Sequence, residues 1–452
     1  MAKKLIRNIH VVFGNVPGRR CDILITNNRI SRIENACSIS DDGCGVVIDG
    51  ANLYCLPGVI DDQVHFREPG LTHKATIYTE SRAAIAGGVT SFMEMPNTDP
   101  LATTVELLEE KYSIAGRMSL ANFSFFMGTT NTNFEEVMKI DPKNVCGVKI
   151  FMGSSTGKML VDNIPTIERI FGNIQNCPIS VHCENDTMIK ANLDKLKREI
   201  GEENITAEHH PLIRDADACY ASSSLAVDLA KKHGCRLHVL HISTAKEISL
   251  FRNDIPLKDK KITAEACIHH LTFCDEDYVW LGNFLKWNPA VKSSTDRTAV
   301  WNAMLDDFID VIATDHAPHT IKEKRQSYLK APSGGPLVQH GLNAMLQNNI
   351  DGKRPVSLQT IVEKMCNNPA TLFNITDRGF IREGYFADLV LVDMNKHYTV
   401  SKDNLLYKCG WSPFEGQRFN SEITHTIVNG NLVYEHGKFN EVANGERLLF
   451  ER

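Results

Sequence analysis

The fold follows from the stretch Leu56-Pro57-Gly58-Val59-Ile60-Asp61-Asp62-Gln63-Val64-His65-Phe66-Arg67-Glu68-Pro69-Gly70. Its apolar beginning predicts a buried β-strand, and its polar end carries an imidazole and a guanidinium. Because side chains two residues apart in a strand point the same way, we expect Gln63, His65 and Arg67 to share one face. Imidazole suits zinc, and a planar guanidinium binds a carboxylate through two parallel hydrogen bonds. The stretch therefore predicts a strand that ends at a metal site, next to a carboxylate-binding residue.

The composition of the 452-residue chain is that of a globular protein, with 42% apolar and 23% charged residues. A net charge of -6 and the lack of a long basic run argue against a nucleic-acid surface. No apolar stretch approaches the ~20 residues that span a bilayer, so no membrane association is expected. Thirteen scattered cysteines without a Cys-x-x-Cys pair, and no apolar leader, predict free thiols in a cytoplasmic protein.

Strand-like and helix-like segments alternate from residue 57 to about residue 375. Between the apolar runs lie helical patterns, for example over residues 78–86, 187–200 and 215–233. With the strand that ends at His65, the expected strands number eight; the others cover residues 89–93, 123–127, 147–151, 179–182, 237–241, 262–265 and 311–313. Strict alternation implies a parallel sheet, and eight units predict an α/β fold of the (β/α)₈ TIM-barrel type.

Both ends of the chain are rich in β-strand patterns. Strands are expected at residues 6–12, 21–26, 30–33 and 46–53, and again at 388–393, 423–428 and 432–436. Asn27-Asn28 and Asn429-Gly430 are typical of hairpin turns. Neither end is long enough for a good sandwich, so we expect one small discontinuous β-sandwich domain. The predicted domains are 1–56 and 378–452 for its two parts, and 57–377 for the barrel.

The opening stretch resembles the first metal motif of the dihydroorotases in the amidohydrolase superfamily, Asp-x-His-x-His-Phe-Arg-Glu-Pro-Gly. In this chain Gln63 stands where the first histidine of that pattern is expected. The resemblance implies the same barrel and a zinc-dependent cyclic amidohydrolase, which interconverts dihydroorotate and N-carbamoyl-L-aspartate in pyrimidine biosynthesis. It also implies one or two zinc ions in each subunit.

The resemblance assigns the metal ligands, which stand at the ends of the expected strands. His65 and Asp315 match ligands of the first metal, and Asp315 also matches the general acid/base. His182 and His241 match ligands of the second metal. Lys149 lies between Val148 and Ile150, where a charged amine is costly unless neutralised or paired. It matches the lysine whose carbamate bridges both metals, whereas the alternative is a surface lysine on an edge strand.

Four residues are candidates for substrate binding. Arg67 and Asn97 match residues that hold the substrate carboxylate, Asn288 matches a contact to the pyrimidine ring, and His319 matches a substrate-binding position. Asn97 and Asn288 also lie beside prolines, where an asparagine often serves only to form a turn. The polar segment 321–335 is either a mobile lid or a solvated loop. His238, three residues before His241, is expected to face away from the site, towards a helix.

Several alternatives stay open at this point. Gln63 is either a weak oxygen ligand or no ligand at all. The substrate could be the ring of an allantoinase or a hydantoinase, or the chain could be an inactive subunit of an assembly. The expected partners are a small-molecule substrate and a second copy in a homodimer, the commonest assembly of soluble proteins.

Overall fold

The computed structural model describes residues 2–14, 16–153 and 159–452. Its centre is a barrel of parallel strands: β6 (Val59–Val64), β7 (Val89–Glu94), β8 (Asn122–Phe125), β9 (Met127–Gly128), β10 (Val148–Phe151), β11 (Ile179–His182), β12 (Leu237–Val239), β13 (Ile262–Cys267) and β14 (Val311–Ala313). β6, β7 and β8 pair in one sheet, and β9 to β14 pair in another. Only Phe126 separates β8 from β9, so the two form one position, and a parallel bridge from Val64 to His316 closes the ring. The predicted (β/α)₈ barrel is confirmed.

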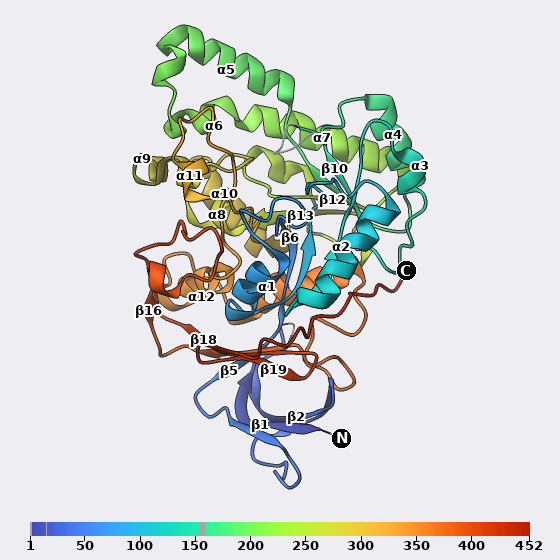
Figure 1. Ribbon diagram of the computed structural model, residues 1–452, viewed down its shortest axis with the longest axis vertical. Helices are drawn as coiled ribbons and strands as arrows, with labels where there is room; N and C mark the ends of the chain where they lie inside the picture. Colours follow the sequence, from blue (N-terminus) through green and yellow to red (C-terminus); the bar gives the residue numbers. More distant parts are fainter. Residues whose placement is uncertain (1, 15, 154–158) are drawn as a thin grey trace.

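Helices alternate with the strands and cover the outside of the barrel (Figure 1). The longer helices are α1 (Ile77–Ala86), α2 (Val105–Met118), α4 (Ile164–Asn173), α5 (Asp186–Ile200), α7 (Ala216–His233), α10 (Ser294–Leu305) and α12 (Gly341–Asp351). The shorter ones are α3 (Phe134–Val137), α6 (His210–Ile213), α8 (Ile268–Thr272), α9 (Tyr278–Leu281), α11 (Ile321–Lys324), α13 (Leu358–Val362) and α14 (Asn368–Phe373).

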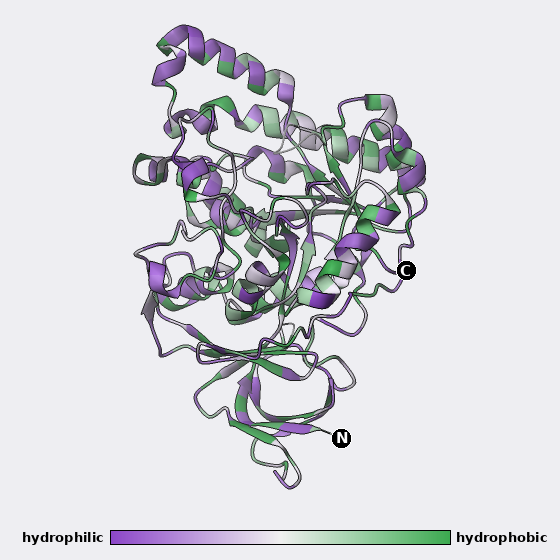
Figure 2. Ribbon diagram, in the orientation of Figure 1, coloured by the Kyte–Doolittle hydropathy of each residue, from purple (hydrophilic) through white to green (hydrophobic). Residues whose placement is uncertain are grey.

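The ends of these helices follow from capping residues. α7 begins where the Asp215 side chain accepts a hydrogen bond from the Ala218 backbone N–H, and it ends at Gly234 with φ +69°. α5 lies at the top of Figure 1 and is largely hydrophilic in Figure 2. Only Ile189 of this helix is buried, so α5 contributes little to the core.

The two ends of the chain form one nine-stranded sheet. Its strands are β1 (Lys3–Val11), β2 (Arg19–Thr26), β3 (Arg29–Asn35), β4 (Val46–Asp49), β5 (Tyr54–Pro57), β15 (Leu389–Asp393), β18 (Glu422–Val428), β19 (Asn431–Glu435) and β20 (Lys438–Phe439). Figure 1 shows β18 and β19 next to the barrel and β1 and β2 below them. Because β5 pairs with β15, the predicted union of the two ends is confirmed, whereas the boundaries at 56/57 and 377/378 stay predictions. β16 (Tyr398–Thr399) and β17 (Arg418–Phe419) form a separate two-stranded sheet and stand between β15 and β18 in the sequence.

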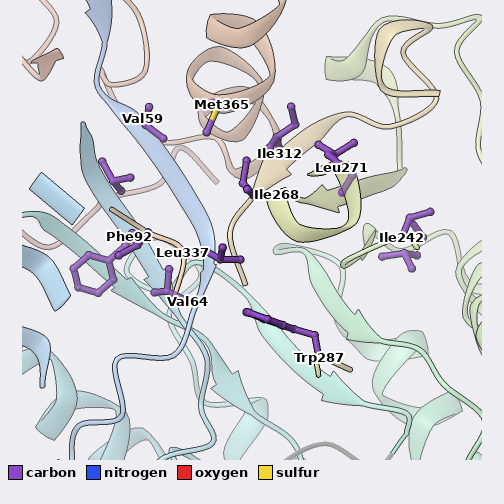
Figure 3. Close-up of a cluster of buried hydrophobic side chains, with 14 of the residues drawn as sticks. Val59, Val64, Phe92, Ile242, Ile268, Leu271, Trp287, Ile312, Leu337 and Met365 are labelled. Carbon is purple, nitrogen blue, oxygen red and sulfur yellow. The ribbon is translucent and has the colours of Figure 1, made fainter. Parts of the chain in front are cut away.

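Apolar side chains fill the space between the strands and the outer helices. Figure 3 shows Val59 and Val64 of β6 and Phe92 of β7 in this layer, with Ile312 of β14 close to Met365. The curved sheet encloses a second apolar cluster of its own, which includes Ile23 of β2 and Leu389 of β15. The cluster of the barrel also takes in residues of the sheet, such as Val390 of β15 and Val428 of β18, so the two bodies share one core, and the sheet has a second cluster of its own.

The structure also bears on the cysteines, on membrane-spanning helices and on the strand expected over residues 46–53. All thirteen cysteines are free, as predicted. Within the described ranges, no helix combines the length and the apolar character that crossing a membrane requires. The strand expected over residues 46–53 is wrong in its second half, because β4 ends at Asp49 and a turn follows before β5.

Candidate active site

The predicted ligands surround one cavity at the carboxyl ends of the barrel strands, the end at which (β/α)₈ enzymes carry their catalytic groups. Its lining consists of Gln63, His65, Lys149, Phe151, His182, His241, Trp287, Asn288, Asp315, Ala317, Ser333 and Gly334. All six residues predicted to bind metal, including Gln63, are therefore close together, although they come from five strands or the turns that follow them.

His65 and Asp315 face each other on one side of the cavity. The Nδ1 of His65 donates to Asn97 Oδ1 at 2.7 Å, so its other nitrogen, Nε2, carries a lone pair. This Nε2 lies 3.3 Å from Asp315 Oδ1. Burial holds the pKa of His65 well below its usual value and raises that of Asp315, so the pair is not a simple ion pair. The electron-pair donors His65 Nε2 and Asp315 Oδ1 thus face the same part of the cavity.

His182 and His241 form a second pair across the cavity. His182 Nε2 donates to Glu184 Oε2 at 3.0 Å, and its Nδ1 lies 2.9 Å from His241 Nε2. Burial alone would raise the pKa of Glu184, but Arg214 and His182 lower it to about 2. A carboxylate behind a histidine is the usual support for an imidazole that binds a metal.

Lys149 reaches the cavity from β10 and is only 1% exposed. Its Nζ lies 4.7 Å from the centre of the Phe151 ring. Burial lowers the pKa of this amine to about 8, although the carboxylates of Glu265 and Asp315 act in the opposite direction. The alternative of an edge-strand surface lysine is wrong, since β10 lies inside the sheet between β9 and β11.

The donor arrangement fits a divalent metal. Two ligands ~2.0–2.1 Å from a tetrahedral zinc ion lie about 3.3 Å from each other. The separations of 3.3 Å for His65–Asp315 and 2.9 Å for His182–His241 are close to this value. Both pairs also have the supporting hydrogen bonds, to Asn97 and Glu184, that orient an imidazole ligand.

Gln63 is oriented as a donor to Asp315. Its Nε2 donates to Asp315 Oδ1 at 3.3 Å, while its Oε1 accepts from Cys267 Sγ at 3.6 Å. With this orientation the amide oxygen faces away from the His65–Asp315 pair. Gln63 therefore serves Asp315 as a hydrogen-bond partner in this conformation.

Three residues at the rim adopt left-handed backbone conformations. The φ angles are +69° at Arg67, +43° at His241 and +47° at Asp315. Such conformations cost free energy for residues other than glycine and collect at functional sites. Each of the three follows the end of a barrel strand, and the side chains of His241 and Asp315 line the cavity.

The predicted substrate-binding residues lie in or beside the cavity. Asn288 lines it, and the Oδ1 atom of Asn288 is buried without a hydrogen-bond partner in the described structure. Arg67 Nη2 lies 3.2 Å from His319 Nε2, which in turn lies 3.0 Å from the carbonyl oxygen of Ser333 on the cavity wall. Asn97 contacts His65, as described above. Burial lowers the pKa of Arg67 to about 10, a value at which it remains cationic at neutral pH.

The expected orientations hold in part. Gln63 and His65 both line the cavity, in agreement with alternation, although the pairing of β6 with β7 shifts in register between Asp61 and Val64. His238 contacts a helix as expected, because its ring centre lies 5.8 Å from that of Phe373 in α14. It lies inside the barrel, however, where it is fully buried and its Nε2 lies 3.1 Å from Asp62 Oδ2 on β6. The turn at His241 begins after β12 ends at Val239, so a three-residue spacing does not imply opposite faces here.

Sequence reasoning did not single out Glu184, Cys267 or Trp287 as parts of the site. Glu184 stands two residues after His182, and Trp287 directly precedes Asn288, so proximity in the sequence was the available signal. Trp287 Nε1 donates to the carbonyl oxygen of Asp315 at 3.3 Å and so supports the turn that carries it. No sequence pattern pointed to Cys267.

The chain is similar to known proteins over nearly its whole length. It matches the amidohydrolase family over residues 54–433. The dihydroorotase of Methanosphaera stadtmanae is 32% identical over 413 residues, which cover 91% of this chain and 92% of the relative. The dihydroorotase of Methanosarcina acetivorans is 33% identical, with coverages of 96% and 92%.

Solved structures give the same fold. The L-hydantoinase (dihydropyrimidinase) from Arthrobacter aurescens aligns with a TM-score of 0.91 and 26% identity over 99% of this chain and 100% of its own. The dihydropyrimidinase from Brevibacillus agri aligns over 100% of both chains with a TM-score of 0.88, and at 22% identity it shows the fold alone. On its sequence, barrel and arrangement of ligands, the chain belongs to the amidohydrolase family.

Proposed function

We propose that this chain is a zinc-dependent dihydroorotase that interconverts dihydroorotate and N-carbamoyl-L-aspartate in pyrimidine biosynthesis. The observation that carries the proposal is the joint placement of two donor pairs and a buried arginine at one end of the barrel. The similarity to dihydroorotases over more than nine-tenths of the chain supports the same activity. The reaction is the hydrolysis, and reversible closure, of a ring amide.

The residues present would hold one or two zinc ions in each chain. His65 and Asp315 would hold the first, and His182 and His241 the second; a carbamate on Lys149 would bridge them. Gln63 would have to turn its amide to act as a ligand of the first zinc, because its oxygen faces Cys267. When bound, zinc supplies a Lewis acid for the amide carbonyl and lowers the pKa of its bound water to roughly 7.

Asp315 acts as general acid and base in this proposal. Its carboxylate takes a proton from the attacking water and returns it to the ring nitrogen as the amide bond breaks. The hydrogen bond from Gln63 Nε2 holds Oδ1 of Asp315 in place, and Trp287 holds its backbone. Because the carboxylate is already oriented, the proton transfer requires little reorganisation.

Arg67, Asn97, Asn288 and His319 bind the substrate. Arg67 supplies the charge that a ring carboxylate needs, and the unpartnered Oδ1 of Asn288 is suited to accept from a ring N–H. His319 connects Arg67 to the cavity wall at Ser333. This set favours a substrate that carries both an anionic group and a cyclic amide.

A hydantoinase or allantoinase activity is the second candidate, because the Arthrobacter aurescens L-hydantoinase aligns over the whole chain. It would leave Arg67 without an anionic substrate partner.

A third reading is an inactive assembly subunit, motivated by Gln63 in place of histidine. The near-complete donor set argues against it, since a non-catalytic chain has no need to bury Lys149, Asp315 and Arg67 together.

The test is dihydroorotate hydrolysis by purified protein reconstituted with zinc and bicarbonate. We expect turnover that a chelator abolishes, that zinc restores, and that the isosteric variant Asp315→Asn lacks. Turnover of hydantoin but not of dihydroorotate would establish the second candidate. Folded, zinc-loaded protein that acts on neither ring would establish the inactive subunit.

We further propose that the enzyme works in the cytoplasm as a homodimer. Free thiols support a reducing compartment, and closed dimers are the commonest assembly of soluble proteins. Sedimentation of the purified protein measures the assembly directly; a monomer at micromolar concentration would contradict it.

A further inference from the structure

We propose that Asp62, His238 and Glu265 form an additional divalent-cation site inside the barrel, separate from the two donor pairs of the active site. The three side chains come from β6, β12 and β13. One ligand atom from each lies within 4.8 Å of the others, and among the described residues no other group of three histidine, cysteine or carboxylate side chains is as compact.

The distances within this triad are those of groups that surround a small ion. His238 Nε2 lies 3.1 Å from Asp62 Oδ2 and 3.8 Å from Glu265 Oε2. Neighbouring ligands of a tetrahedral ion lie about 3.3 Å apart, so these separations need little adjustment. Thr263 contacts the other nitrogen, Nδ1, through its hydroxyl at 2.9 Å and so orients the imidazole.

Two oxygen atoms of the triad make no hydrogen bond. Asp62 Oδ1 and Glu265 Oε2 are buried without a hydrogen-bond partner in the described structure, and both side chains are 0% exposed. Buried carboxylate oxygens are costly unless they are paired or coordinate a metal. The unsatisfied oxygens are therefore an observation, independent of the clustering, that points to a bound cation.

The charge of the triad also favours a cation. Asp62 and Glu265 supply two negative charges, and a proton on His238 would compensate only one of them. The nearby cation is Lys149, whose amine interacts with Glu265. The carbamate proposed on Lys149 would replace that cation with an anion. A divalent ion bound to two carboxylates and a neutral imidazole would balance the charge completely.

The ligand set selects the class of metal. One imidazole and two carboxylates suit zinc and other divalent first-row ions, whereas magnesium and calcium prefer oxygen ligands alone. The proposal goes beyond the catalytic assignment: its charge argument takes up the carbamate proposed on Lys149, whereas the distances and the unpartnered oxygens stand without it. Glu265 Oε1 accepts from the His241 backbone N–H at 3.0 Å, so the ion would lie beneath the active site and support its floor.

The experiment counts zinc in chelator-stripped protein after reconstitution with Zn²⁺ alone, by mass spectrometry of the metal. We expect Asp62→Asn to bind one zinc ion fewer per chain than the wild type. The double variant His182→Ala/His241→Ala should lose zinc independently, so that the combined variant shows the sum of both losses. Turnover is not the readout, so failure of this proposal is distinguishable from failure of the proposed dihydroorotase activity.

The matched control is Asp310→Asn, which changes another buried aspartate that pairs with Lys260 at 2.7 Å. This control should keep the zinc content of the wild type. An unchanged zinc count in folded Asp62→Asn would overturn the proposal and leave a protonated His238 between two carboxylates.

Should the variant not fold, wild-type crystals soaked in zinc decide the question. Anomalous scattering at the zinc edge is expected between the three side chains, and its absence would equally overturn the site.

Discussion

Gln63 presents the nitrogen of its amide to Asp315 and turns its oxygen to Cys267. An imidazole at this position could offer a lone pair to the metal position that His65 Nε2 and Asp315 Oδ1 face. In the proposed site, a glutamine in place of this neutral ligand would weaken the first metal position and leave His182 and His241 unaffected. The residue at position 63 would then set how tightly the first metal is held.

Replacing this glutamine by histidine should tighten zinc binding. We expect Gln63→His to lower the dissociation constant of the weaker zinc by at least about 10-fold, the lower end of the effect of altering even a partner of a ligand. Competition with a chromophoric chelator measures the constant. Gln63→Met is the control, because it removes the hydrogen bond to Asp315 without adding a ligand. Equal affinities in all three proteins would show that position 63 does not contact the metal.

In the proposed function, Arg67 decides which ring the site accepts. Removing a buried charge partner costs about 2–5 kcal/mol, and each 1.36 kcal/mol is tenfold in rate. Arg67→Met should therefore lower kcat/KM for dihydroorotate by about 30- to 5,000-fold, while any hydantoin hydrolysis changes little. Arg82→Met, which removes an arginine paired with Glu441 on the outside of α1, is the matched control. A fall of less than threefold would favour a hydantoin substrate.

The sequence was sufficient to predict which residues gather in the cavity, because each ligand stands at the end of an apolar run. It was insufficient for the orientation of individual side chains. His238 turned out to be buried inside the barrel, since the strand ends at Val239 and alternation cannot be continued to His241. The shift of register in β6 is likewise a property of its pairing with β7, which no local pattern encodes.

The segment 321–335 is neither a plain solvated loop nor a free lid. Lys324 is fully buried, and its Nζ donates to the carbonyl oxygens of Lys286, Pro332 and Gly334 at 3.2, 2.9 and 2.8 Å. Lys286 in turn donates to the carbonyl oxygens of Tyr328 and Ala331. The lysines tie the segment to the barrel, and its end lines the cavity through Ser333 and Gly334.

Removing the Lys324 amine should loosen this segment. Each buried carbonyl left without a donor costs about 1–3 kcal/mol, so we expect Lys324→Met to lower local stability by roughly 3 kcal/mol. Amide exchange over residues 325–335 should then become about 100-fold faster in hydrogen-exchange mass spectrometry. Lys322→Met, on the exposed side of the same helix, should leave exchange unchanged. Wild-type exchange in Lys324→Met would mean that other contacts hold the segment.

The barrel and the sheet are joined by a buried polar network as well as by the chain. Arg378 contacts Asp388 and donates to Asn429 Oδ1 at 2.8 Å. Asn122, on strand β8 of the barrel, donates to Asp388 Oδ2 at 3.2 Å and accepts from Asn429 Nδ2 at 2.8 Å. The predicted domain boundary at 377/378 therefore falls next to Arg378, the residue that connects the two bodies.

Breaking this network should destabilise both bodies together. Arg378→Met leaves Asp388 buried without its cation, and removal of one partner from a buried ion pair costs about 3–5 kcal/mol. We expect the free energy of unfolding in urea to fall by that amount. The transition should shift equally in tryptophan fluorescence and in far-ultraviolet circular dichroism. Arg382→Met, an exposed arginine four residues on, should change it by less than about 0.5 kcal/mol. A shift seen by one probe alone would mean that barrel and sheet unfold independently, and that the network does not couple them.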